Sequence, residues 1–157
     1  MSIERVRAFF ARYSRKGDIL EFPVSSATVE LAAQAVGCSP GHIAKTLSFA
    51  VNGGCVLVVC AGDAKIDNPK FKAQFQTKAK MLSPGEVLSF TGHAVGGVCP
   101  FAIENPAVTV YLDESLRRFD AVYPAAGSAN SAIRLTPAEL ERFSESAGWV
   151  NVCKLPE

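Results

Sequence analysis

TLSFAVNGGCVLVVCA, residues 46–61, is the most informative segment of the chain. Two mostly apolar runs, Thr46 to Val51 and Gly54 to Ala61, flank Asn52-Gly53, a dipeptide typical of a two-residue hairpin turn. The second run is apolar on both faces, which is typical of a strand in the middle of a sheet. We therefore predict a β-hairpin whose second strand is central.

Helices and short strands are expected on both sides of this hairpin. Helical signals are the apolar spacing from Ile3 to Tyr13, a segment Ala27 to Val36 ended by Gly37, and capping boxes after Ser83 and Thr136. Shorter helical segments are expected from Pro40 and over 68–75, and short strands over 18–22, 78–82, 99–103, 108–112, 121–124, 133–135 and 150–153. This irregular alternation predicts an α+β fold with a mixed sheet. With no linker or repeat, residues 1–157 are expected to form a single compact domain.

Composition excludes several classes of protein. The 157 residues are 48% hydrophobic, too many for a disordered chain, and 16 Lys+Arg against 15 Asp+Glu exclude a polybasic nucleic-acid binder. Five cysteines, an odd number with no C-x-x-C pair, are typical of reduced thiols. The longest apolar stretch, Cys55 to Ala61, is too short to cross a membrane. We expect a cytoplasmic protein with neither a membrane nor DNA as partner.

Common catalytic and cofactor motifs are absent from the sequence. It has no G-x-G-x-x-G, no P-loop and no G-x-S-x-G elbow. Cys38 and His42 could share a metal, but zinc needs three or four ligands, so we expect no metal and no cofactor. Cys99 and His93 could act as nucleophile and base, with a packed loop cysteine as the alternative.

Three segments place polar or glycine-rich residues where they could bind a ligand or take part in catalysis. Lys45 stands where a helical turn meets an apolar strand, and a lysine there can reach a phosphate or carbonyl. Residues 91–101 hold three glycines and a proline, which expose backbone N–H groups for an oxyanion. Residues 123–131 are small and hydroxyl-rich, as in a pocket for a small substituent. A solvated lysine and two ordinary turns are the alternatives.

Together these segments resemble a known family. I-A-K-T-L, G-D-A-K-I-D, T-G-x-x-x-G-G-V-x-P and A-A-G-S occur in the order found in YbaK/EbsC proteins, the prolyl-tRNA-synthetase-associated editing domains. The resemblance runs from about Asp18 to Cys153. It implies a compact α+β domain around a curved mixed sheet flanked by helices, and hydrolysis of the ester of a mischarged aminoacyl-tRNA.

The resemblance also implies roles for individual residues. Lys45 matches the family's catalytic lysine and would anchor the terminal nucleotide or the ester carbonyl, with Thr46 beside it. The glycine-rich loop matches Gly96, Gly97 and Pro100, and backbone N–H groups near the two glycines would stabilise the oxyanion. The expected pocket wall consists of Phe22, Gly127, Ser128, Asn130 and Ser131.

The resemblance defines the substrate and the partners less narrowly than it defines the site residues. Cys-tRNA(Pro) deacylases of this family carry an aspartate where this chain has Ala132 and a tyrosine where it has Phe22, so cysteine, alanine, serine and threonine esters all stay open. The partner would be the 3′ end of an aminoacyl-tRNA, with tRNA(Pro) expected first. Lysines over 63–80, with a net charge of +3, and the arginines of the first helix could cradle an acceptor stem. Weak binding by so neutral a domain suggests recruitment by prolyl-tRNA synthetase or an elongation factor.

Two other functions compete with this interpretation. A non-catalytic relative would bind a tRNA end or a small ligand without hydrolysis. A thiol enzyme would use Cys99 as nucleophile. Replacing Lys45 or Cys99 separates the three hypotheses.

Overall fold

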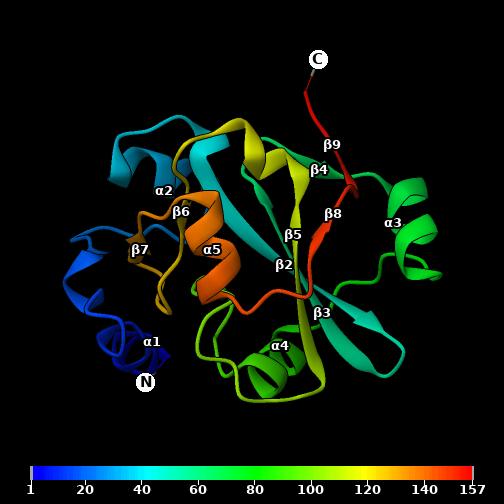
Figure 1. Ribbon diagram of the computed structural model, residues 1–157, viewed down its shortest axis with the longest axis horizontal. Coiled ribbons are helices and arrows are strands. Elements are labelled where there is room, and N and C mark those ends of the chain that lie inside the picture. Colours follow the sequence, from blue (N-terminus) through cyan, green and yellow to red (C-terminus); the bar gives the residue numbers. More distant parts are fainter. Residues whose placement is uncertain (1, 157) are drawn as a thin grey trace.

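The computed structural model describes residues 2–156, and its centre is a five-stranded mixed sheet (Figure 1). The strand order is β6 (Tyr123–Pro124), β2 (Ile43–Val51), β3 (Gly54–Ala61), β5 (Val108–Asp113) and β8 (Trp149–Val150). Within this five-stranded sheet of the described residues, the β2–β3 pair is antiparallel and the other three pairs are parallel. Two smaller pairs, β1 (Ile19–Glu21) with β7 (Ser131–Ile133) and β4 (Lys65–Ile66) with β9 (Cys153–Lys154), flank it. The predicted α+β fold with a mixed sheet is confirmed.

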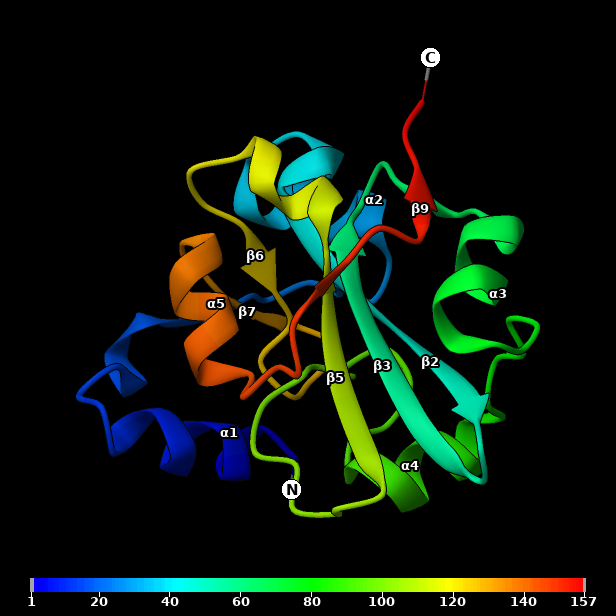
Figure 2. The ribbon, with the colours of Figure 1, turned by 45° about the vertical axis from the view of Figure 1, so that its right-hand side comes forward.

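The predicted hairpin is present in the expected register. Val51 pairs with Gly54, and the two turn residues Asn52 and Gly53 have φ of 51° and 79°. Both positive values are those of a type I′ turn, which matches the twist of the flanking strands. In Figure 2 the long strands β5, β3 and β2 lie side by side, and β3 is buried from Cys55 to Ala61.

Local capping chemistry sets the ends of the helices. Thr28 caps α2 and Gly37, at φ 84°, ends it. Ser83 and Thr136 form complete capping boxes at the starts of α4 and α5, each followed by proline at the first helical position. The five α-helices are α1 (Ser2–Ala11), α2 (Val29–Val36), α3 (Asn68–Phe75), α4 (Pro84–Thr91) and α5 (Pro137–Phe143). Short 3-10 helices cover Lys16–Asp18, Pro40–His42 and Glu114–Arg118.

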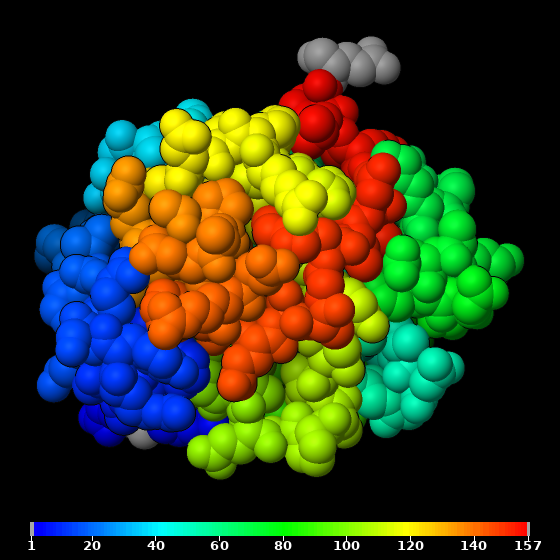
Figure 3. All heavy atoms as spheres, viewed as in Figure 1, coloured from blue at the N-terminus to red at the C-terminus, as the bar shows by residue number. Residues whose placement is uncertain are grey.

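Aromatic side chains pack α1 against α5 and α3 against the sheet. Phe10 of α1 contacts Phe143 of α5 and Phe101, with ring centroids 5.2 and 5.0 Å apart. Phe71 of α3 packs on Phe49 of β2 at 4.8 Å. In the space-filling view, α1, α5 and the C-terminal segment cover much of the face turned to the viewer (Figure 3).

Two predicted strands are wrong. Residues 78–82 form a single bridge, between Phe49 and Met81, because the capping box at Ser83 starts α4 directly after it. Residues 99–103 form no strand. There the carbonyls of Phe101 and Ala102 accept from His93 Nε2 and from Arg5, at 2.8 Å each, and Ala102 has φ of 57°. Side chains thus take the bonds that a partner strand would make.

Candidate functional site

A gap in the outer edge of β2 opens into a cavity. β6 pairs with Ile43 and Ala44 only, and residues 80–82 bond to β2 again at Ser48 and Ala50. Between these two partners lies a cavity of about 470 Å³, within the usual size range of ligand pockets. It is bounded by α2, the start of α4 and the glycine loop; its lining includes Lys45, Thr46, Ser48, Met81, Val87, Gly96, Ser131 and Ala132.

Lys45 is the single charged residue of this lining within the described part of the chain. Its ammonium donates to the carbonyls of Gly62 and Ala64, at 3.4 and 2.5 Å, in the turn that follows β3. Arg118 anchors the same turn through Asp63, with contacts of 3.0 and 2.5 Å. Since an ammonium has three donors, one proton of Lys45 is left for a ligand. Lys45 lies within β2, and not at its start as predicted.

Thr46 follows Lys45 and brings three unpaired polar groups to the cavity. Its Oγ1 is buried without a hydrogen-bond partner among the described residues. Its backbone N–H and C=O have none either within residues 2–156, because the outer edge of β2 is uncovered at this position. Unpaired groups of this kind are rare in folded proteins and call for an explanation.

The glycine loop touches this cavity through Gly96 and not through Gly97. Gly96 has φ of 97° and lines the cavity. Gly97 donates its N–H to Ala94 at 3.0 Å and packs on the backbone of Ser128, where a Cβ would lie 2.8 Å from its N and Cα atoms. Gly97 therefore joins two loops and lines a neighbouring cavity of about 450 Å³, on the side of α1.

The predicted pocket wall divides between these two cavities. Ser131 lines the Lys45 cavity, whereas Gly127 and Ser128 line the cavity beside α1. The Ser128 hydroxyl donates to Asn130 Oδ1 at 3.0 Å and shares a second hydrogen bond, of 2.7 Å, with the Ser131 hydroxyl. Asn130 in turn donates its amide to the Phe22 carbonyl at 3.1 Å. Phe22 and Asn130 are not in the lining of the Lys45 cavity, and they bond to each other next to Ser131, which is.

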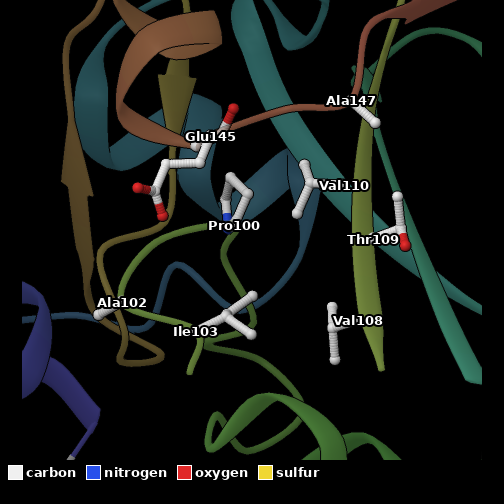
Figure 4. A pocket seen from close by; sticks show the side chains of 9 residues that line it. Pro100, Ala102, Ile103, Val108, Thr109, Val110, Glu145 and Ala147 are labelled. Atoms are coloured by element: carbon white, nitrogen blue, oxygen red, sulfur yellow. The ribbon is translucent and has the colours of Figure 1, made fainter. Parts of the chain in front are cut away.

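Pro100 lies in a third, smaller cavity. This space of about 140 Å³ is formed with Ile103, Val108 and Val110, and Figure 4 shows Pro100 facing it together with Glu145. Pro100 is therefore not in the lining of the Lys45 cavity, whereas Thr46 and Ala132 line that cavity together with Lys45.

Cys99 and His93 lie close together, but both are buried where a substrate cannot reach them. Cys99 Sγ lies 3.5 Å from His93 Nε2, and both side chains are fully buried. Burial raises the pKa of the Cys99 thiol to about 12 and lowers the pKa of His93. A protonated, buried thiol is a poor nucleophile, which argues against the thiol-enzyme hypothesis. The described residues contain no cluster of three or more metal-ligating side chains.

Sequence and structure comparisons identify the family of this chain. The model of the aminoacyl-tRNA editing domain matches residues 24–143. The chain belongs to the aminoacyl-tRNA editing domain family. This editing domain is 55% identical over 155 residues, 98% of each chain, to the uncharacterized protein YwhH of Bacillus subtilis (strain 168).

Two further relatives connect the editing domain to proline tRNA ligation. One is the proline–tRNA ligase of Thermotoga maritima, 28% identical over 93 residues, which are 59% of this chain and 16% of the ligase. The other is a crystal structure described as a proposed trans-editing enzyme for prolyl tRNA synthetase. It superposes with a TM-score of 0.86 at 30% identity, over 98% of this chain and 97% of that one. These likenesses support editing of aminoacyl-tRNA as the general role.

The charged helices of the editing domain do not form one cradle. α1, with its arginines, and α3, with Lys70 and Lys72, lie at opposite ends of the molecule in both ribbon views (Figures 1 and 2). Lys80, by contrast, is next to Met81, which lines the Lys45 cavity. None of the described helices has the length and hydropathy that a membrane span needs.

Part of the lining was missed by sequence analysis. Ser48, Met81 and Val87 come from a strand, a bridge segment and a helix, and no motif links them. Met81 and Val95 are 58% and 62% exposed although apolar, and such exposure cannot be seen in the sequence.

Proposed function

We propose that this protein hydrolyses the ester of a mischarged aminoacyl-tRNA in the Lys45 cavity. The observation that carries the proposal is the cavity itself, because it places the lysine ammonium, an uncharged lining and the glycine loop around one space. Its size fits an aminoacyl group with part of the terminal nucleoside. Membership of the editing-domain family supports the same reaction class.

The reaction needs little chemical machinery from the protein. A water molecule attacks the ester carbonyl and gives up a proton, the acyl C–O bond breaks, and the ribose oxygen leaves with a proton. If the vicinal ribose hydroxyl attacks first, the acyl group moves to the neighbouring oxygen, and a water molecule then has to hydrolyse that ester. An aminoacyl ester is already activated, so orientation and stabilisation of the oxyanion supply the acceleration. The absence of a nucleophilic triad in the lining is consistent with this mechanism.

Lys45 and the glycine loop have distinct roles in this proposal. The free proton of the Lys45 ammonium binds the terminal nucleotide or the ester carbonyl, while Gly62 and Ala64 hold the other two. Gly96 brings exposed backbone to the opposite wall. Gly97 contributes by fixing that loop on Ser128.

The lining disfavours a basic amino acid as the acyl group. Among the described lining residues no acidic side chain is present, so a basic amino acid has no counter-ion. Ala132 lines this cavity, at the position where the resemblance to the cysteinyl deacylases implies an aspartate in those proteins. We therefore propose tRNA(Pro) carrying alanine, cysteine, serine or threonine as substrate, with prolyl-tRNA synthetase or an elongation factor as the recruiting partner.

The test is deacylation of tRNA(Pro) charged separately with these four amino acids. Lys45→Met keeps the length of the side chain without its charge and should lower kcat/KM by about 100-fold or more, the usual effect of removing one charged donor. Lys16→Ala removes an exposed charge from the short 3-10 helix Lys16–Asp18 and is the matched control, expected to keep activity.

Folding of Lys45→Met has to be checked by thermal unfolding, since the ammonium also holds the turn after β3. Equal activity of Lys45→Met and wild type would refute the role of the lysine. Survival of every ester, on tRNA(Pro) and then on other tRNAs, would refute the hydrolase and leave the binding relative.

A further inference from the structure

The unpaired edge of β2 at Thr46 has the hydrogen-bonding pattern of a strand that lacks one partner residue. Ala50 donates its N–H to Lys80, and Ser48 accepts at its C=O from Leu82, so both residues direct backbone groups away from β3. Backbone direction alternates along an antiparallel strand, which means that Thr46 directs its N–H and C=O the same way.

Both neighbours of Thr46 along this edge are already covered. Ala44 pairs with Pro124 of β6, and Ser48 bonds to Leu82. Between Ala44 and Ser48, Thr46 is the outward-facing described residue with neither its N–H nor its C=O bonded, and this part of the edge opens into the Lys45 cavity. The gap therefore has room for one residue, not for a strand from another protein.

We propose that Thr46 binds the aminoacyl group of the substrate as this missing residue, through its main-chain N–H and C=O. This inference rests on the proposed function and specifies how its site recognises the acyl group. The α-amino group of an aminoacyl ester donates to the Thr46 carbonyl, and the ester carbonyl accepts from the Thr46 N–H. A single residue can make both bonds only in the antiparallel arrangement.

This arrangement accounts for how the cavity can hold the substrate's charged amino group and how it can orient the ester. The α-ammonium of the substrate finds an acceptor although the described lining contains no carboxylate. An antiparallel residue opposite Thr46 also runs from the Leu47 side to the Lys45 side, so its ester oxygen and ribose point toward Lys45. The Thr46 hydroxyl lies on the face shared with the substrate side chain, because paired residues of an antiparallel ladder project to the same face.

Two hydrolysis-resistant ligands test the pairing without relying on catalysis. They are 3′-(L-alanylamino)-3′-deoxyadenosine and its 3′-propionylamino analogue, which lacks the α-amine. The wild type should bind the alanyl compound at least tenfold more tightly in calorimetric or NMR titrations, because hydrogen bonds to charged groups are the stronger ones. Equal affinity, or no binding of either compound, would overturn the assignment of Thr46.

Two substitutions at Thr46 separate its side chain from its backbone. Thr46→Val removes the hydroxyl and should keep the preference for the alanyl compound. Thr46→Pro also removes the N–H, a change that edge strands tolerate, and should bind both compounds at least tenfold more weakly than Thr46→Val. Leu47→Pro is the matched control for register, since its N–H faces β3 and the substitution should unfold the protein.

The outcomes distinguish this inference from the proposed hydrolysis. Deacylation of a charged tRNA with equal affinity for the two compounds would refute the role of Thr46 and leave the deacylase intact. A tenfold preference without deacylation of any tRNA would support Thr46 as the aminoacyl-binding residue and refute the hydrolase. Should Thr46→Pro not fold while Leu47→Pro does, the proposed direction of the backbone is wrong.

Discussion

Gly97→Ala is expected to destabilise the protein by forcing two loops apart. A Cβ at this position would lie 2.8 Å from the N and Cα atoms of Ser128 and 2.9 Å from its carbonyl carbon. These are backbone atoms, which cannot rotate away as the end of a flexible side chain can. The loops must separate by about half an ångström, and overpacking of this kind costs about 1–3 kcal/mol.

The cost should be visible in thermal unfolding followed by circular dichroism. At roughly 3 °C per kcal/mol for a chain of this size, the Tm should fall by about 3–9 °C. Gly85→Ala is the control, because no atom lies within 4 Å of its Cβ position, near the start of α4, and alanine there should be neutral or stabilising by about 0.5–1 kcal/mol.

A Tm for Gly97→Ala that matches the wild type would refute the argument that the two loops are in close contact. Activity measured well below the Tm adds a second readout. Loss of deacylation in a folded variant would mean that the spacing of the glycine loop, and not only its stability, matters to the site.

Two further predictions concern ionisable groups. Cys99 should escape alkylation by iodoacetamide in the native protein at pH 8, since burial raises its pKa to about 12. The treated protein should therefore keep its activity. Loss of activity together with a modified Cys99 would restore the thiol mechanism. Arg118 beside Asp63 holds the pKa of that carboxyl below its usual value, so their ion pair stabilises the fold above about pH 4 and is lost as the pH falls further. Because both side chains are partly exposed, the ion pair contributes less than about 1 kcal/mol to stability. Between pH 4 and pH 2, the free energy of unfolding measured in urea should therefore change slightly less with pH in Asp63→Asn than in the control Asp120→Asn.

Local signals in the sequence correctly predicted the parts of the fold that depend on a few neighbouring residues. Asn52-Gly53 predicts the type I′ hairpin because both residues accept positive φ. Thr28 and Gly37 bound α2 through bonds made within its own first and last turns. The buried character of β3 follows from its unbroken apolar run.

Predictions failed where distant residues compete for the same backbone groups. The apolar residues over 99–103 resemble a strand, but Arg5, 97 positions away from Ala102, takes one of the carbonyls that a ladder would use. Pro100, which the resemblance assigned to the substrate site, lines a different cavity from Lys45, together with Ile103 and Val110. The order of motifs along the chain does not determine the direction in which a loop turns in the folded protein.

The family, the central hairpin and the candidate residues Lys45 and Thr46 could all be inferred from the amino-acid sequence, because motifs and hairpin signals are local in the chain. Which residues share the cavity with Lys45 and Thr46 depends on how distant segments pack. The open edge at Thr46 exists because β6 stops after Pro124 and residues 80–82 bond to β2 no earlier than Ser48, at Ser48 and Ala50. Such a gap depends on pairings between segments that are dozens of residues apart, and these form only when the whole sheet is assembled.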